Sequence, residues 1–442
     1  MTAPMTIERV SASDATTLAT DRGPAPMNIG VVLRVEAGAV LSFDEVRGLV
    51  ASRVTLVPRL RQRLERTPPG CGRALWVDAA DFDVGDHLEQ TVLENGAGTA
   101  ELLTATATFV CTPLPRDRPL WAARWVTGLD GGSAALVLSA HHCLADGIGG
   151  LAVLAALSDE GSSGAPPAGP FPTAAPRTGD VALDAWQGRL RALRRMPSRL
   201  ADTAAGIREL AGTPRRPRLA ERTSLNRPTG PLRRLTVVST TLPELVAAAH
   251  SRGCTVNDLV LSSVAAAVGG LLRARGEQVS DLVVSVPVSA RSSASPDGLG
   301  NHNGVMALAL PLVVDRDERL RRIVALTSDR KAPQRGTSSG PLGLAFRALA
   351  RVGAFQLFID HQRLVHTFVT NVRGPRLPWH VGGHEVTTVV PVAVTPGNVG
   401  VSFDVLSYAG RLAVTVVADP AVVPDQDVLT AALADELARV SR

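Results

Sequence analysis

Residues 134–150 read AALVLSAHHCLADGIGG, and this stretch holds the most informative pattern in the chain. Its first six residues, Ala134 to Ser139, form an apolar run with the length of a buried β-strand. The run leads into His141 and His142, and the residues from Gly149 to Leu157 read as a helix. We therefore predict a strand, a turn that carries a histidine pair, and a helix.

The residue types in this turn indicate acid–base chemistry. General base catalysis needs a base of near-neutral pKa within hydrogen-bond reach of the proton that it removes. Histidine suits that task best, so we predict that His142 is the general base. Asp146 is expected to fold back as a structural brace, with an arginine as its usual ion-pair partner. Gly147 is expected to permit a tight backbone turn.

The same residues allow other interpretations. A histidine in this position can also be a hydrogen-bonded core residue, and His141 fits a structural neighbour better than a second base. A metal site made of His141, His142 and Asp146 is disfavoured, because adjacent residues of an extended strand point to opposite faces. Cys143 is disfavoured as a nucleophile, because direct attack needs no covalent intermediate and a small buried residue is the simpler interpretation.

The chain of 442 residues exceeds what one hydrophobic core usually supports, so two domains are expected. The run GSSGAPPAGPFPTAAPRTG, which begins at Gly161, has little to bury and reads as a linker. We predict an N-terminal part over residues 1–160, a connector over 161–230 and a C-terminal part over 231–442.

Both large parts mix strands with helices, which predicts an α/β chain. Ser42 and Glu45 form a plausible capping box, as do Thr255 and Asp258 for a helix that ends near Arg275. A closing helix is expected over residues 425–440, with an apolar side made of Val428, Leu429, Ala432, Leu433, Leu437 and Val440. Further strands are predicted at 281–290, 304–314, 386–394 and 411–418.

Composition excludes several classes of protein. A hydrophobic content of 45% with 20% charged residues is typical of a globular chain rather than a disordered one. Aromatic residues make up 3% and no binding motif appears, so nucleic acid is not an expected partner. The four scattered cysteines predict reduced thiols rather than a disulfide frame or zinc site. Residues 1–17 do not read as a signal peptide, and no apolar run approaches the roughly 18 residues of a membrane span.

The connector is rich in arginine from residue 183 to residue 218. These arginines are Arg189, Arg191, Arg194, Arg195, Arg199, Arg208, Arg215, Arg216 and Arg218. One interpretation is a solvated surface. The other is electrostatic attachment to anionic lipid through an amphipathic basic helix around residues 183–200.

The segment His141-His142-Cys143-Leu144-Ala145-Asp146-Gly147 resembles the H-H-x-x-x-D-G signature of the coenzyme A-dependent acyltransferase superfamily, which includes chloramphenicol acetyltransferase and condensation domains. The whole chain resembles, more closely, the bacterial wax ester synthase/diacylglycerol acyltransferase family. The supporting motifs follow in family order: Pro26-Met27-Asn28-Ile29-Gly30, Val57-Pro58 to Leu64, Pro119-Leu120-Trp121, Leu225-Asn226-Arg227-Pro228, Arg233-Arg234, Asn257-Asp258, Val286-Pro287-Val288-Ser289, Gly300-Asn301, Asn371 to Pro375, and Ser407-Tyr408.

This resemblance implies two chloramphenicol acetyltransferase-like subdomains of α/β sandwich type around a central substrate tunnel. It implies a catalytic site at His142, His141 and Asp146, in which His142 is the base. Gly147, Asn257 and Asp258 would support it. Asn257 and Asp258 have a simpler interpretation as the cap of a helix. The chain departs from the family pattern at Ala122-Ala123-Arg124 and at Pro113-Leu114-Pro115, which leaves the acceptor open.

The implied reaction moves a fatty acyl group from acyl-CoA, as co-substrate, to diacylglycerol or a long-chain alcohol, with no metal or other cofactor. One alternative is a secondary-metabolite acyltransferase that acts on a small hydroxyl or amine. A second is a catalytically silent protein that binds acyl ligands. A cytoplasmic location is expected, with or without peripheral attachment to the membrane or to lipid droplets.

Overall fold

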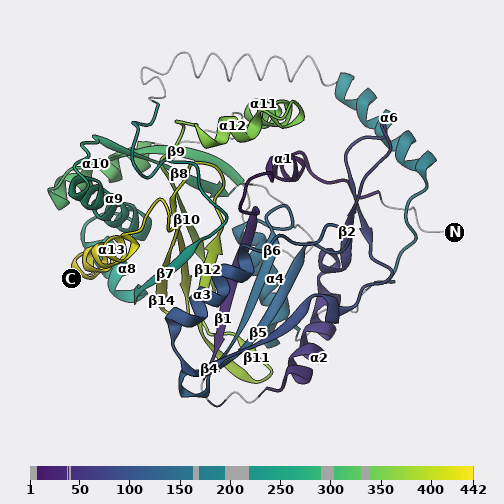
Figure 1. The fold of residues 1–442 in the computed structure, drawn as a ribbon, viewed down its shortest axis with the longest axis horizontal. Coiled ribbons are helices and arrows are strands. Elements are labelled where there is room, and N and C mark those ends of the chain that lie inside the picture. The colour runs from purple at the N-terminus through teal and green to yellow at the C-terminus, as the bar shows by residue number, and fades with distance from the viewer. Residues whose placement is uncertain are drawn as a thin grey trace.

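The computed structural model describes residues 7–441 except 37, 39–40, 163–168, 195–218, 290–302 and 330–338. Two six-stranded sheets form its framework, and helices cover them (Figure 1). The first sheet consists, in order of pairing, of β11 (His380–Val381), β12 (His384–Ala393), β1 (Asn28–Val35), β6 (Ala134–His141), β5 (Trp121–Leu129) and β4 (Leu88–Ala97). The strand predicted at 134–139 is therefore β6, which lies between β1 and β5 and is two residues longer than expected.

The second sheet consists, in order, of β7 (Arg234–Thr241), β14 (Arg411–Ala418), β13 (Val401–Tyr408), β10 (Thr367–Arg373), β8 (Asp281–Ser289) and β9 (Asn303–Pro311). Strand β10 runs parallel to both neighbours, whereas the other pairs are antiparallel. The strands predicted at 281–290, 304–314 and 411–418 correspond to β8, β9 and β14. A separate hairpin joins β2 (Gln62–Glu65) and β3 (Leu75–Asp78).

The helices take their places through local capping and apolar faces. They are α1 (Ala12–Thr20), α2 (Phe43–Arg53), α3 (Thr99–Val110), α4 (Gly147–Leu157), α5 (Asp159–Ser162), α6 (Thr178–Arg194), α8 (Leu242–Ser251), α9 (Val256–Ala274), α10 (Arg316–Asp329), α11 (Ser339–Arg351), α12 (Phe355–Asp360) and α13 (Gln426–Val440). Both predicted capping boxes are present, one at the start of α2 and one at the start of α9. One predicted face is partly wrong. Val428 of α13 is exposed, whereas the other predicted residues of this face, Leu429, Ala432, Leu433, Leu437 and Val440, pack on the core.

Helix α9 is the central helix of the second lobe. It is long and apolar enough to pass the length and composition test for a membrane span, which the sequence interpretation did not anticipate. However, 72% of its apolar 18-residue stretch is buried inside the protein, where it packs against the strands of the second sheet and α13. This extensive burial explains why its sequence is mainly apolar. We therefore describe α9 as a core helix.

The two lobes share strands and core. Strands β11 and β12 belong to the C-terminal part of the sequence, yet β12 pairs with β1 in the first sheet. Helix α3 packs against β1, β4 and β6 of the first sheet and against β7 of the second, within a hydrophobic cluster that also includes residues of β12 and β14. A division of the chain into residues 1–160 and 231–442 does not anticipate this exchange. That division stays a prediction about folding units. The first sheet contains strands from both sides of it, since β11 and β12 come from the C-terminal part.

Asp404 of β13 links the two sheets where the exchange occurs. Its carboxylate is buried and accepts a hydrogen bond from the backbone N–H of Ala393 in β12 (2.7 Å) and one from the Thr370 hydroxyl in β10 (3.2 Å). Burial raises the pKa of Asp404 to about 7, although both hydrogen bonds favour the charged form. The carboxyl group is therefore a titrating group at the lobe junction.

We expect the stability of the protein to fall between pH 4 and pH 7 through Asp404. Its pKa is higher in the folded than in the unfolded state, so the folded state binds more protons in this window and loses stability as the pH rises. The slope is on the order of 1.4 kcal/mol per pH unit. Urea unfolding at several pH values should show this slope in the wild type and a smaller one in Asp404→Asn. Parallel curves for the two proteins would contradict the assignment.

Candidate active site

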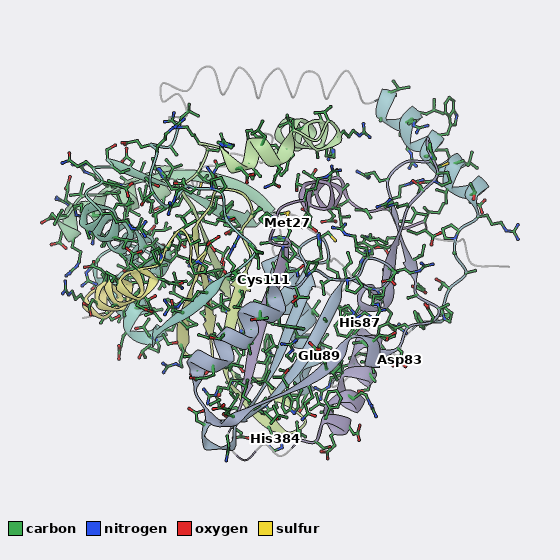
Figure 2. All side chains as sticks on the ribbon, in the orientation of Figure 1. Met27, Asp83, His87, Glu89, Cys111 and His384 are labelled. Atoms are coloured by element: carbon green, nitrogen blue, oxygen red, sulfur yellow. The ribbon has the colours of Figure 1, made fainter. Side chains whose placement is uncertain are left out.

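Strand β6 delivers the histidine pair to the end of the first sheet. His141 is the last residue of the strand and pairs with Asn28, the first residue of β1. The next residue, His142, lies in a turn and donates its backbone N–H to the carbonyl of Met27 (2.9 Å). Met27 lies near the centre of the view in Figure 2, above β1 and between the two lobes. The pairing of β6 with β1 therefore sets the position of both histidines.

The P-M-N-I-G segment of β1 has a packing role beside this pair. The side-chain amide of Asn28 donates to the carbonyls of Val110 (2.9 Å) and Thr112 (3.0 Å), which fastens the end of α3 to the start of β1. A Cβ atom at Gly30 would lie 2.5 Å from Cγ2 of Val110. Gly30 therefore allows the close approach of α3 to this strand.

His141 is buried and both of its ring nitrogens are bonded. Nδ1 accepts the backbone N–H of Cys143 (3.1 Å), so the proton of the neutral ring lies on Nε2, which faces Oδ2 of Asp21 (3.1 Å). Asp21 also accepts from the backbone N–H of Met27 (3.0 Å) and pairs with Arg116 (2.5 Å). Burial opposes the charge on Asp21, but the hydrogen bond from His141 and these other partners keep its pKa below the usual value. These contacts hold the ring of His141 in one orientation.

His142 is half-buried, and its surroundings shift the pKa of its ring. Burial lowers the pKa of its imidazole below 6.5, with His141 adding to the effect, while a hydrogen bond to its own backbone and the charge of Asp146 oppose it. The ring is therefore neutral at pH 7, the state in which an imidazole can accept a proton.

Asp146 and Gly147 begin helix α4. Asp146 is fully buried and caps the helix, since its Oδ1 accepts the backbone N–H of Gly149 (2.8 Å). The predicted arginine partner stays a prediction. The expected reason for Gly147 was wrong: it is the first residue of a right-handed helix and has no positive φ. Glycine is needed because a Cβ atom there would lie 2.9 Å from Cγ2 of Val372 in β10.

We expect Gly147→Ala to reduce activity by about tenfold with little loss of stability, because the new methyl group would push α4 away from β10. Val372→Ala in the same protein should restore most of the activity by removing the contacting methyl group. Steady-state kinetics of the two single variants and the double variant measure this coupling as a double-mutant cycle. Additive effects would show that the contact has no role.

Asn257 and Asp258 begin α9 in the second lobe. The carboxylate of Asp258 accepts from the N–H (2.8 Å) and hydroxyl (2.7 Å) of Thr255 and from the hydroxyl of Thr327 (2.8 Å). These bonds make Asp258 a helix cap, as the simpler interpretation predicted. The side-chain oxygen of Asn257 accepts from the amide of Asn371 in β10 (2.9 Å). Two motifs separated by 114 positions therefore meet in the fold.

Strand β10 connects the two groups of site residues. Val372 points toward Gly147 in the first lobe, and Asn371, its neighbour, bonds to Asn257 in the second. Successive side chains of a strand point to opposite faces, so β10 is contacted from both sides. Gly147 and Asn257 therefore both contact strand β10. Because Gly147 directly follows Asp146, this strand links the end of the histidine loop to the start of α9.

Other predicted residues have structural places. Trp121 is buried, donates its indole N–H to the carbonyl of Leu60 (2.7 Å) and stacks on His87 with 4.6 Å between ring centroids. Cys143 is buried, and this burial raises the pKa of its thiol well above the usual value. One surface depression is lined by Ser224, Arg227, Arg275, Val422, Pro424 and Asp425, which include no predicted site residue. The substrate tunnel stays a prediction.

Sequence reasoning missed Asp21, the acceptor that orients His141. No pattern in the segment Asp21-Arg22-Gly23 marks it, because its partners lie up to 120 positions away. It also missed the contact between Gly147 and Val372, although Val372 stands within the quoted motif that begins at Asn371.

Comparisons with known proteins agree with this fold. A family model described as wax ester synthase/diacylglycerol acyltransferase catalytic domain matches residues 10–260, and a model of the C-terminal domain of the same family matches residues 299–441. A putative diacylglycerol O-acyltransferase of Mycobacterium bovis is 30% identical over 411 residues, which cover 88% of this chain and 86% of that protein.

Two solved structures share the fold. The wax ester synthase/diacylglycerol acyltransferase of Marinobacter aquaeolei has a TM-score of 0.68 at 21% identity, over 98% of this chain and 100% of that one. The starter condensation domain of rhizomide synthetase, as a mutant in complex with C8-CoA and Leu-SNAC, has a TM-score of 0.61 at 17% identity, over 99% of this chain and 94% of that one.

Proposed function

Since the chain belongs to the wax ester synthase/diacylglycerol acyltransferase family, we propose that it moves a long-chain acyl group from acyl-CoA to a hydroxyl acceptor with His142 as the base. The chain is an acyltransferase, and the products of its family are triacylglycerols and wax esters. The observation that supports this assignment is the lowered pKa of His142, which keeps its ring neutral at pH 7 and able to accept a proton. Both ring nitrogens of the neighbouring His141 are engaged, by the backbone N–H of Cys143 and by the carboxylate of Asp21.

In the proposed mechanism, acyl-CoA and the acceptor bind together. His142 takes the hydroxyl proton while the acceptor oxygen forms a bond to the thioester carbonyl carbon. The tetrahedral intermediate collapses with cleavage of the carbon–sulfur bond, and the imidazolium returns the proton to the coenzyme A thiolate. The products are an ester and coenzyme A. Neither a covalent acyl-enzyme nor a metal is part of this route, and holding both substrates in one orientation supplies much of the rate.

The other site residues have positioning roles in this proposal. Asp146 fixes the first turn of α4, and Gly147 lets that turn approach β10. Asp258 and Asn257 hold the start of α9 and its contact with Asn371. These contacts keep the two lobes in register around His142, which is the geometry a reaction between two bound substrates needs.

A panel of acceptors tests the substrate assignment. Labelled palmitoyl-CoA is offered with dioleoylglycerol, hexadecanol and a set of small polar alcohols and amines in parallel. We expect the lipid acceptors to give the highest kcat/KM. A higher value for a polar acceptor would favour the secondary-metabolite alternative, and release of coenzyme A that does not depend on any acceptor would contradict acyl transfer.

We also propose a cytoplasmic location at a lipid surface. The four cysteines are free thiols in the structure, which suits a reducing compartment. Diacylglycerol and long-chain alcohols reside in membranes, so an enzyme that uses them gains from peripheral attachment.

A further inference from the structure

Helix α6 has two apolar faces. The inner face, with Val181 and Ala185 buried, packs on the β2–β3 hairpin through Leu75 and Val77. The outer face carries four large apolar side chains in solvent, namely Leu183 (57% exposed), Trp186 (57%), Leu190 (40%) and Leu193 (57%). Their spacing of three, four and three residues places them in one stripe. Figure 1 shows α6 at the periphery of the molecule, at the upper right.

This outer stripe is held in place from beneath. Arg9 donates to the carboxylate of Asp184 (2.6 Å) and to the carbonyl of Val181 (2.8 Å), and it also donates to the carbonyl of Cys71 (2.9 Å) beside the hairpin. These bonds join α6 to the body of the N-terminal lobe. The stripe is therefore a preformed surface on a docked helix.

The charges around the stripe are positive toward the end of the helix. On a helix of about 3.6 residues per turn, the exposed side chains of Arg189 and Arg191 lie on opposite sides of the stripe. The acidic residues of α6, Asp180 and Asp184, lie in its first half, and Asp184 is paired with Arg9 at 2.6 Å and more loosely with the exposed Arg191 at 3.7 Å. Residues 189–218 carry nine arginines against two acidic residues, a net charge of +7 in a chain whose total is +5.

We infer that the outer face of α6 is the surface by which the protein docks on an anionic phospholipid bilayer. Tryptophan and leucine between flanking arginines are the combination by which interfacial helices bind such surfaces. A nucleic acid would not match an apolar stripe, and a second copy of α6 would bring the arginines of both helices together. The biological sense rests on the proposed function, because a lipid acceptor dissolves in that bilayer.

The tryptophans provide a direct test. Trp186 is exposed, whereas the other four tryptophans of the chain, Trp76, Trp121, Trp125 and Trp379, are each at most 7% exposed. Brominated phospholipids quench tryptophans that enter the acyl region. We expect vesicles of brominated phosphatidylcholine and phosphatidylglycerol to quench part of the fluorescence of the full chain, and Trp186→Phe to lose that part while still binding. No quenching, or equal quenching in both proteins, would overturn the inference.

Flotation of the full chain with unbrominated vesicles measures the binding itself. We expect Trp186→Ser/Leu190→Ser to weaken binding at least tenfold, and Arg189→Gln/Arg191→Gln to weaken it on the order of tenfold when phosphatidylglycerol is present. The matched control is Val246→Ser/Val428→Ser, which removes two exposed valines from α8 and α13. An equal loss of vesicle binding in the control variant would overturn the inference. It would also be overturned if light scattering showed that the wild type is a dimer, and if the α6 variants dissociated this dimer while their binding to vesicles stayed unchanged.

Activity on water-soluble substrates separates this inference from the proposed function. With a short acyl-CoA and butanol, the α6 variants should keep the wild-type kcat/KM, because no residue of the outer stripe belongs to the site around His142. Vesicle binding is measured without substrate, so the protein can bind vesicles even if it does not transfer acyl groups. Equally, it can transfer acyl groups between water-soluble substrates even if it does not bind vesicles.

Discussion

Replacing His142 by glutamine lowers kcat/KM for acyl transfer to hexadecanol by about 10²–10⁴-fold, which is the usual contribution of a general base. Glutamine has a similar size and can form hydrogen bonds, but it cannot take the acceptor proton. Acyl-CoA binding should therefore persist, as measured by calorimetry. Release of coenzyme A from palmitoyl-CoA with saturating alcohol gives the rate.

The matched control for this variant is His384→Gln, which changes a partly exposed histidine at the start of β12, near the lower edge of the molecule in Figure 2. It should retain the wild-type rate. If His142→Gln kept the wild-type rate as well, the base would have to lie elsewhere. If neither the wild type nor the variants turned over while both bound acyl-CoA, the catalytically silent alternative would be supported.

The pH dependence follows from the electrostatics of His142. Only the neutral ring acts as a base, so kcat/KM rises with pH through the pKa of His142 and then stays level. Burial lowers that pKa, so the rise lies below pH 6.5 and the enzyme is at its plateau at pH 7. A rise centred above pH 7 would contradict a buried neutral imidazole as the base.

Replacing Arg233 by methionine lowers the free energy of unfolding by about 3–5 kcal/mol, the cost of breaking a buried ion pair by removing one partner. Its guanidinium is almost fully buried, donates to the carbonyls of Gly230 (2.8 Å) and Thr395 (2.7 Å), and lies 3.6 Å from the carboxylate of Asp419. The variant leaves these acceptors buried with one donor fewer. Because Thr395 follows β12 and Arg233 precedes β7, the loss loosens the junction of the two sheets.

The adjacent arginine is the control. Arg234 pairs with Asp427 at 2.7 Å, but both side chains are largely in solvent. Arg234→Met should therefore cost no more than about 1 kcal/mol. Urea denaturation of both variants, monitored by circular dichroism, compares them directly. Equal shifts of the midpoint in the two variants would show that burial of Arg233 does not carry the effect.

The two lobes are joined beside the histidine loop, where the proposed site lies. The exchange of β12 into the first sheet, the Asp404 link and the contact of Gly147 with Val372 all join the lobes beside the histidine loop. A base near a junction can be reached by two different substrates from different lobes, which the proposed direct reaction requires.

Features that depend on nearby residues could be predicted from the sequence alone. The strand before His141, the capping boxes at Ser42 and Thr255, and the helix after Gly147 follow from spacing and residue type, because caps and amphipathic faces involve partners about four residues away. The acyltransferase activity could also be predicted, since a histidine pair followed by Asp-Gly is a local pattern, whereas the role of His142 as the base stays a prediction.

Features that depend on distant partners needed the tertiary structure. The pairing of β12 with β1, the bond of Asp21 to His141 and the bond of Asn371 to Asn257 join segments more than 100 positions apart. Many apolar strands satisfy the same alternation, so the sequence does not say which of them pair. For the same reason, the role of Gly147 and the exposure of the outer stripe of α6 could be decided only by seeing what packs against each of them.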